Sequence, residues 1–452
     1  MNSTASIESQ QGSRRSAYLP AMVAAIGGLL FGFDTAVING AIVFIKRQFG
    51  LSDTQTEIAA SSLLLGCVVG ASVAAFTSDR FGRKRVLLAA AALFALSSIG
   101  AALPRDLTEF AVARLLGGVA IGIASTLSPL YIAEISPAQQ RGLLVCLNQL
   151  AIVAGILLSY SVNYLLTGAG PANWRWMFAS AAVPSIAFLF TLLFIPESPR
   201  WLVQKGRVQD AEHFLVQSVG PQAAVTEVKA IRDAIAEERG ELLDPTFRKA
   251  LLVAIVIALA SQFTGINTII YYGSIVFLEH VPHQTASTAL WANVIIGAIN
   301  FVATIAGMLL IDRSGRKRLL SSAFGGMALS LVGVSAAIRF QASGTIVLIF
   351  ILTYVACFAV GVGTGTWVLM AEICPTRVRG RAMAVATVCL WCGTLLVTLT
   401  FLSLVNLFTV AGVFLLYAVI SVGAFLFVWQ AVPETKGKTL EEIERYWLSQ
   451  RS

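Results

Sequence analysis

The string Asp79-Arg80-Phe81-Gly82-Arg83-Lys84-Arg85 recurs, nearly unchanged, about 230 residues later as Asp312-Arg313-Ser314-Gly315-Arg316-Lys317-Arg318. Each copy lies between two long apolar runs, and a second matched string follows each copy some fifty residues later. That second string is Ala133-Glu134-Ile135-Ser136-Pro137 in the first half and Ala371-Glu372-Ile373-Cys374-Pro375 in the second. The same basic motif at matching places in two halves of an apolar chain indicates a duplicated helical bundle in a membrane.

The composition points to the same class of protein. Hydrophobic residues make up 57% of the chain and charged residues 12%, with a mean hydropathy of +0.78. This balance excludes an ordinary soluble globular protein. The lengths of the apolar runs predict twelve spans. We therefore expect an all-α membrane protein of two pseudo-symmetric six-helix bundles, divided into an N-terminal tail (1–17), a first bundle (18–195), a helical linker (196–247), a second bundle (248–431) and a C-terminal tail (432–452).

The basic residues predict the orientation. With the N-terminus inside, the cytoplasmic segments hold about 26 Lys and Arg and the outer loops only about 5, as the positive-inside rule requires. The net charge of +8 then follows from topology and implies no nucleic-acid partner. We expect a multi-pass protein of the plasma or inner membrane, surrounded by lipid, with both termini in the cytoplasm and functional as a monomer. Residues 1–17 are polar and resemble no signal peptide.

Two ionisable residues, Asp34 and Arg114, lie well inside predicted spans. A buried charge is costly unless it is paired, so it marks either a function or a partner. At 1.5 Å per helical residue the two side chains lie roughly 16 Å and 9 Å from the same membrane face, close enough for contact. One interpretation is a static ion pair. The other is a proton switch, because a carboxylate beside arginine stays ionised, whereas one left alone in a dry site takes up a proton.

Acidic and basic residues recur at matched positions of the predicted cytoplasmic ends. Ordinary positive-inside topology explains the basic residues but leaves the matched acids unexplained. We therefore favour a latch between the two halves that holds the cytoplasmic gate shut. Its candidate residues are Asp79, Arg83, Glu134, Arg141, Glu197 and Arg200 in the first half, and Asp312, Arg316, Glu372, Arg379 and Glu434 in the second.

Polar side chains inside apolar spans are the next signal, because each needs a partner or a ligand. Amides exchange hydrogen bonds with hydroxyl groups, and aromatic faces pack on the C–H faces of a sugar ring. With no lysine or arginine left over for an anionic ligand, a neutral polyol is favoured over helix–helix bonding alone. The residues concerned are Gln149, Gln262, Asn267, Tyr271, Asn300, Trp367 and Trp391. Gly265 and the glycines at 361, 363 and 365 are points where helices can bend.

Four strings in this order identify a family resemblance. They are Gly27-Gly28-Leu29-Leu30-Phe31-Gly32-Phe33-Asp34-Thr35, Pro196-Glu197-Ser198-Pro199-Arg200-Trp201-Leu202, Gln262-Phe263-Thr264-Gly265-Ile266-Asn267 and Pro433-Glu434-Thr435-Lys436-Gly437-Lys438-Thr439. From Gly27 to about Glu442 the chain resembles the sugar porters of the major facilitator superfamily, most closely the bacterial sugar–proton symporters of the xylose, galactose and glucose type.

The resemblance implies a rocking twelve-helix bundle that transports a small neutral sugar, bound mostly by the C-terminal half, together with a proton. By position it makes Asp34 the proton carrier and Arg114 its partner. It places Gln149, Gln262, Asn267, Asn300, Trp367 and Trp391 at sugar contacts, and Phe31 and Tyr271 in the cavity wall.

Departures from the family pattern leave the substrate open. The paired glutamines of the family read Ser261-Gln262 here, the second polar position of span five is Ile156, and Leu390 precedes Trp391 where the family has an amide. Xylose is therefore not assigned. A facilitative carrier of a sugar or of a polyol such as inositol, and a non-transporting sugar sensor, remain alternatives.

An enzyme is the remotest reading of the sequence. The three histidines His213, His280 and His283 lie in predicted loops without partners for metal or nucleophile chemistry. We expect no metal and no cofactor.

Overall fold

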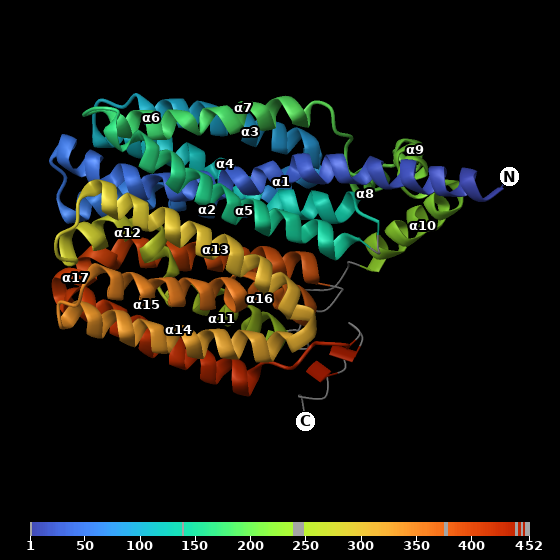
Figure 1. The fold of residues 1–452 in the computed structure, drawn as a ribbon. Helices are drawn as coiled ribbons and strands as arrows, with labels where there is room; N and C mark the ends of the chain where they lie inside the picture. The colour runs from blue at the N-terminus through green and yellow to red at the C-terminus, as the bar shows by residue number, and fades with distance from the viewer. Residues whose placement is uncertain are drawn as a thin grey trace.

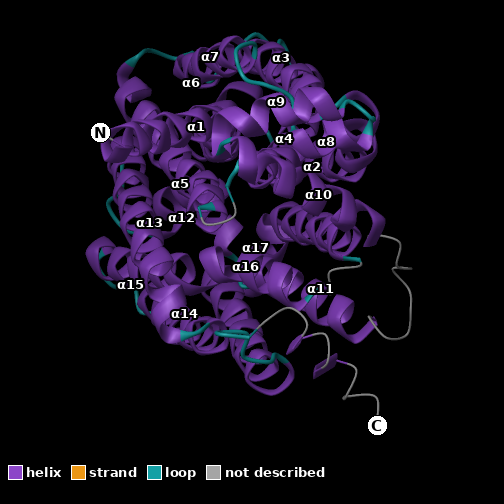
Figure 2. Ribbon diagram, turned by 90° about the vertical axis from the view of Figure 1, so that its right-hand side faces the viewer, coloured by secondary structure: helices purple, strands orange, loops and turns teal. Residues whose placement is uncertain are grey.

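The computed structural model describes residues 2–137, 140–237, 248–374, 378–438, 442–443 and 446–447. Side chains are described from Tyr18 onward within these ranges, except those of Arg141, Glu237, Asp312 and Arg379. In this part of the chain every regular element is a helix (Figure 2). The predicted all-α fold is confirmed.

The first half comprises the helices α1 to α7, and short helices follow it. The half contains α1 (Asn2–Phe49), α2 (Asp53–Phe81), α3 (Arg83–Ala102), α4 (Leu107–Ile135), α5 (Arg141–Leu165), the 3-10 turn η1 (Leu166–Gly168), α6 (Asn173–Ser180) and α7 (Ala182–Leu192). The linker contributes α8 (Pro199–Gln204), α9 (Val208–Val219) and α10 (Pro221–Glu237), the short helices that its charge pattern predicts.

The second half begins with α11 (Arg248–Phe263) and α12 (Ile266–His280). It continues through α13 (Ala286–Ser314), α14 (Arg316–Arg339), α15 (Gly344–Cys357), the π-helical segment η2 (Phe358–Gly363), α16 (Thr364–Ile373) and α17 (Arg379–Ala431). The predicted bends are present: Gly265 has φ 86° between α11 and α12, and the π segment falls in the glycine-rich stretch.

Eleven stretches of the described chain are long and apolar enough to cross a membrane. One of them, Gly380–Ala431, has 52 residues, whereas a single crossing needs about 20. Thr409, with φ 63° and ψ 162°, interrupts the helical backbone inside it. This stretch therefore supplies two spans, and the described chain contains the twelve that the sequence predicts.

The repeated basic motif forms a tight turn in each half. Gly82 joins α2 to α3 with φ 100°, and Gly315 joins α13 to α14 with φ 85°. A Cβ on Gly82 would come 2.2 Å from Glu197 Oε2, and one on Gly315 would come 2.7 Å from Glu434 Oε2. Glycine is needed at both turns because the positive φ and the close carboxylate each exclude a side chain.

In Figure 1 the first half lies above the second, and the linker helices lie at one end of the bundle with the start of α1. We call this the linker end; it holds α8–α10, Gly82 and Gly315. The opposite face, the far end, holds Ser52 and Thr285, which cap α2 and α13 with reciprocal side-chain–backbone bonds.

Both predicted tails need comment. Residues 2–17 of the N-terminal tail are helical and continue α1 without a break. These residues contain no proline; the first proline of the chain is Pro20. In the C-terminal tail the structure describes residues 432–438 and the helical residues Glu442–Ile443 and Tyr446–Trp447.

Candidate functional site

The centre of the first half holds the ion pair expected from the sequence. Arg114, on α4, donates from Nη1 to Asp34 Oδ1 at 2.5 Å and from Nη2 to the Asp34 carbonyl oxygen at 2.9 Å. Arg114 is fully buried and Asp34 is 4% exposed. The guanidinium also lies 5.1 Å from the centre of the Phe178 ring. These bonds fix α4 against α1.

Small residues make room for this pair. A Cβ on Gly117, one turn after Arg114, would approach Asp34 Oδ2 to 3.2 Å and Ser97 Oγ to 2.3 Å. The Ser97 hydroxyl itself donates to the Ala113 carbonyl at 2.8 Å, so it is not a partner of the carboxylate. The second oxygen of Asp34 therefore lies beside a glycine surface rather than beside a competing donor.

A cluster of amides lies in the second half where α11 breaks into α12. Gln262 Oε1 accepts from Asn267 Nδ2 at 2.6 Å and from Thr394 Oγ1 at 3.0 Å, and Gln262 Nε2 donates to Ser261 Oγ at 2.8 Å. The left-handed Gly265 turns the chain so that Gln262 and Asn267 meet. These bonds leave one Nε2 hydrogen of Gln262 and the side-chain amide oxygen of Asn267 available to a ligand.

Two aromatic residues on the predicted cavity wall meet across the halves. Phe31 of α1 lies 5.2 Å from Trp391 of α17, measured between ring centres. Trp391 is 3% exposed, and its indole Nε1 has no hydrogen-bond partner among the described residues. A buried donor without a partner is costly and marks a place where a hydroxyl ligand or a water would bind.

The other predicted contacts are placed less tightly. Gln149 is half-buried, and its amide makes no hydrogen bond within the described chain. Asn300 is 7% exposed, Trp367 is half-buried, and neither contacts the Gln262 cluster in any recorded bond of the described residues. Tyr271 is fully buried, and its hydroxyl has no hydrogen-bond partner among the described residues. Like the Trp391 indole, this hydroxyl marks a place where a ligand or a water would bind.

Sequence reasoning missed the central contact between the halves. Asn39 of α1 donates from Nδ2 to the carbonyl oxygens of Ile269 and Ile270, each at 2.9 Å. Its Oδ1 accepts from the Ser274 backbone N–H at 2.9 Å, from the Ser274 hydroxyl at 2.6 Å and from Asn293 Nδ2 at 3.1 Å. Asn39 is fully buried, five residues beyond Asp34. The sequence feature that could have identified Asn39 is the one used for the other amides: it is a polar residue inside an apolar span.

The charged residues of the linker end form one clamp in each half. Arg83 contacts Glu134 through Nε and Nη2, each at 3.1 Å, and Arg316 contacts Glu372 through the same two atoms at 3.2 and 3.1 Å. Glu197 Oε1 accepts from the Arg83 backbone N–H at 2.9 Å, and Glu434 Oε1 from that of Arg316 at 3.0 Å. Ser198 and Thr435 donate to Glu134 and Glu372. The duplication seen in the sequence is thus a duplicated network.

In this conformation the clamps do not form the predicted latch between the halves. Arg83 also pairs with Asp79 at 3.0 Å, and Arg200 lies 4.0 Å from Glu134, so these ion pairs join residues of one half and do not bridge the two. The physical reason is proximity: Asp79 and Glu134 lie in the last turns of α2 and α4, beside the basic turn of their own half. The side chains of Arg141, Asp312 and Arg379 lie outside the described residues.

A profile of the family described as "Sugar (and other) transporter" matches residues 20–447. The chain belongs to this sugar transporter family. Its relatives include the arabinose-proton symporter of Bacillus subtilis, 39% identical over 436 residues that cover 94% of each protein, and the D-xylose-proton symporter of Escherichia coli strain K12, 38% identical over 468 residues with the same coverage. The resemblance inferred from the sequence is confirmed.

A solved structure of a sugar transporter superposes on most of this chain. It is the partially occluded inward open conformation of the xylose transporter of E. coli, with a TM-score of 0.85 and 34% identity, covering 94% of this chain and 100% of the other. The twelve spans therefore adopt the major facilitator fold. Membership of a transporter family places this chain among multi-pass membrane proteins.

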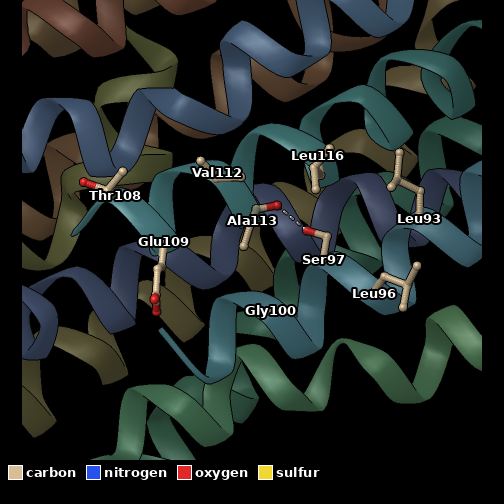
Figure 3. A pocket seen from close by; sticks show the side chains of 9 residues that line it. All are labelled: Leu93, Leu96, Ser97, Gly100, Thr108, Glu109, Val112, Ala113 and Leu116. Carbon is tan, nitrogen blue, oxygen red and sulfur yellow. Dashed lines mark hydrogen bonds between the residues drawn. The ribbon is translucent and has the colours of Figure 1, made fainter. Parts of the chain in front are cut away.

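A hollow on the side of this sugar transporter is not the expected sugar cavity. It lies between α3 and α4 and is lined mainly by apolar side chains, including Leu93, Leu96, Val112 and Leu116, with Glu109 at one edge (Figure 3). The hydrogen bond drawn among its lining residues joins Ser97 to Ala113. An apolar hollow of this kind on a span surface suits lipid rather than a polyol.

Proposed function

We propose that the protein carries a neutral monosaccharide across the membrane together with a proton, by alternating access. The observation that carries the proposal is the buried Asp34–Arg114 pair in the half opposite the amide cluster. Two relatives that are symporters by name, one of arabinose and one of D-xylose, support it. We further propose that the linker end and both termini are cytoplasmic, that the domains divide at 17, 195, 247 and 431, and that the monomer is the working unit.

Proton coupling in this scheme depends on the arginine. With Arg114 donating to the carboxylate, Asp34 holds a negative charge that the site tolerates. When the pair separates, a buried carboxylate without a cation is costly, so Asp34 takes up a proton from the side that is then open. Each protonation state thus favours a different arrangement of α1 against α4.

Sugar binding is assigned mainly to the second half. The free amide groups of Gln262 and Asn267, the unpaired indole N–H of Trp391 and the unengaged amide of Gln149 offer donors and acceptors to ring hydroxyls. Phe31, Tyr271, Asn300 and Trp367 complete the wall. Because these wall residues include no lysine or arginine, an uncharged ligand fits the site better than a carboxylate or phosphate.

The direction of opening in this conformation is part of the proposal. Asn39 binds α12 and α13 through buried bonds, and Tyr164 of α5 packs on Trp291 of α13 at 5.2 Å between ring centres. The acid–base clamps of the linker end, in contrast, lie within single halves. We infer an inward-facing state, and we propose that the clamp charges of the two halves approach one another when the linker end closes.

The test is sugar-dependent proton uptake by the purified protein in liposomes, with a panel of hexoses, pentoses and cyclitols. A rise of external pH that accompanies uptake of one sugar, and that is lost in Asp34→Asn, is the expected result. Sugar flux without proton movement would make the protein a facilitator and Asp34 half of a static ion pair. Binding of a sugar without flux would indicate a sensor.

A further inference from the structure

A second buried acid lies between the two halves, away from the Asp34–Arg114 pair. Glu57, in the second turn of α2 at the far end, is 2% exposed. Its Oε1 accepts from the backbone N–H of Ser403 at 2.8 Å, and its Oε2 accepts from the Ser403 hydroxyl at 2.7 Å. Ser403 belongs to α17, so both bonds cross from the first half to the second. No described ion pair gives this carboxylate a cation.

Other polar contacts cross the halves at the same end but are exposed. Lys46 Nζ lies 3.1 Å from Asp53 in its own half and 3.1 Å from Glu279 in the other. Asp53 in turn accepts from Asn406 Nδ2 at 3.3 Å. The side chains of Asp53 and Glu279 are 42% and 47% exposed, so water screens these pairs and they contribute little. Glu57 differs because its own side chain is buried, although Ser403 is exposed.

An ionised Glu57 has two favourable arrangements. Burial without hydrogen bonds would cost far more than the bonds return, so Glu57 is stable either against Ser403 or in bulk water. Since Ser403 is in the opposite half, the first arrangement requires the far end to be closed. The second requires it to be open wide enough for hydration. Separation of the halves at this point therefore removes both bonds to Glu57.

We propose that Glu57 and Ser403 form the latch of the far-end gate and act as positioning residues that set the balance between the two open states of the transporter. The latch is the counterpart of the linker-end clamps, with one difference: its partners come from different halves. It rests on the proposed transport cycle only for its direction, because its closing and opening concern the far end whatever ligand is carried.

The experiment is hydrogen–deuterium exchange, followed by mass spectrometry, on the full-length protein in lipid nanodiscs without ligand. Ser403→Ala removes the hydroxyl donor and leaves Glu57 buried with one bond fewer. A hydrogen bond to a charged group is worth roughly a tenfold change in an equilibrium. We therefore expect the amides of α2 and α17 that lie at the far end of the bundle to exchange roughly ten times faster. Peptides of α9, at the linker end, should be unchanged and report intact folding.

Three variants make the result specific. Thr400→Ala, a matched control, removes a hydroxyl of α17 that bonds only to the Leu396 carbonyl of its own helix, and should exchange as wild type. Ser403→Thr keeps the donor and should also match wild type. In a Glu57→Leu background, Ser403→Ala should add no acceleration, because no carboxylate is left to satisfy.

The latch is supported if Ser403→Ala accelerates exchange only when Glu57 is present. It is overturned if Ser403→Ala exchanges as wild type does, if Thr400→Ala accelerates exchange equally, or if Ser403→Ala still accelerates exchange in the Glu57→Leu background. Because no sugar is present, a failed transport assay would leave this result standing, and a negative exchange result would leave the transport proposal intact.

Discussion

Replacement of Asp34 by asparagine distinguishes the two interpretations of the buried ion pair, a proton switch and a static structural contact. The substitution keeps the shape of the side chain and the 2.9 Å bond from Arg114 Nη2 to the Asp34 carbonyl oxygen, but it removes the charge that faces Nη1. Arg114 then remains fully buried without a counter-ion. Breaking a buried pair on one side typically costs about 3–5 kcal/mol, so Asp34→Asn should destabilise the arrangement in which α1 and α4 are in contact.

The double variant Asp34→Asn/Arg114→Leu restores electrical balance. Replacement of both partners of a buried pair by uncharged groups is often neutral in stability, so most of the loss in the single variant should be recovered. The proton site, however, is absent from both. Thermal unfolding in detergent therefore distinguishes the two variants, whereas proton-driven accumulation should be abolished in both.

Two transport assays complete the test. Accumulation against a gradient requires coupling to protons, while counterflow exchange requires only that the loaded carrier reorient. We expect Asp34→Asn to lose the first and keep the second. If either variant still concentrates sugar under a proton gradient, the assignment of Asp34 as the proton carrier is refuted and the pair is structural.

Thr394→Val removes a donor that holds Gln262 Oε1 and should weaken sugar binding roughly tenfold, and Gln262→Ala should weaken it too. Thr394→Ser keeps the donor and should bind sugar as wild type does, measured by equilibrium dialysis. Equal affinity in all three variants would show that the amide cluster is not part of the binding site. Asn39→Leu eliminates five hydrogen bonds to the second half and should lower the thermal stability of the unliganded protein. It should also raise the outward-open population, measured as faster hydrogen–deuterium exchange of α12 amides at the far end. Unchanged protection of α12 would contradict this prediction. Gly82→Ala forces a side chain into φ 100° against Glu197 and should cost at least about 1–3 kcal/mol, whereas Gly142→Ala, with open space around it, should be nearly silent in the same unfolding assay.

Some of the site was accessible from single residues and their depth. Asp34 and Arg114 were paired on the basis of helix rise alone, because a charge in an apolar span must find a partner at its own level. The bend at Gly265 was accessible because glycine is the residue that tolerates a positive φ. Glu57, in contrast, was passed over: it lies near the polar start of α2, and a residue there is expected to be hydrated unless another helix covers it.

The repeat of Asp79–Arg85 at Asp312–Arg318, the length of the apolar runs and the distribution of lysine and arginine determined the duplicated twelve-span architecture, since each of these is a local property of the chain. Partner choice was a different matter. Glu134 contacts Arg83 of its own half, while Glu57 contacts Ser403 of the other, yet both are acids near the end of a span. Only the tertiary structure decided between these pairings, because they depend on which helix ends meet in one conformation, and the sequence is the same in every conformation that the transporter visits.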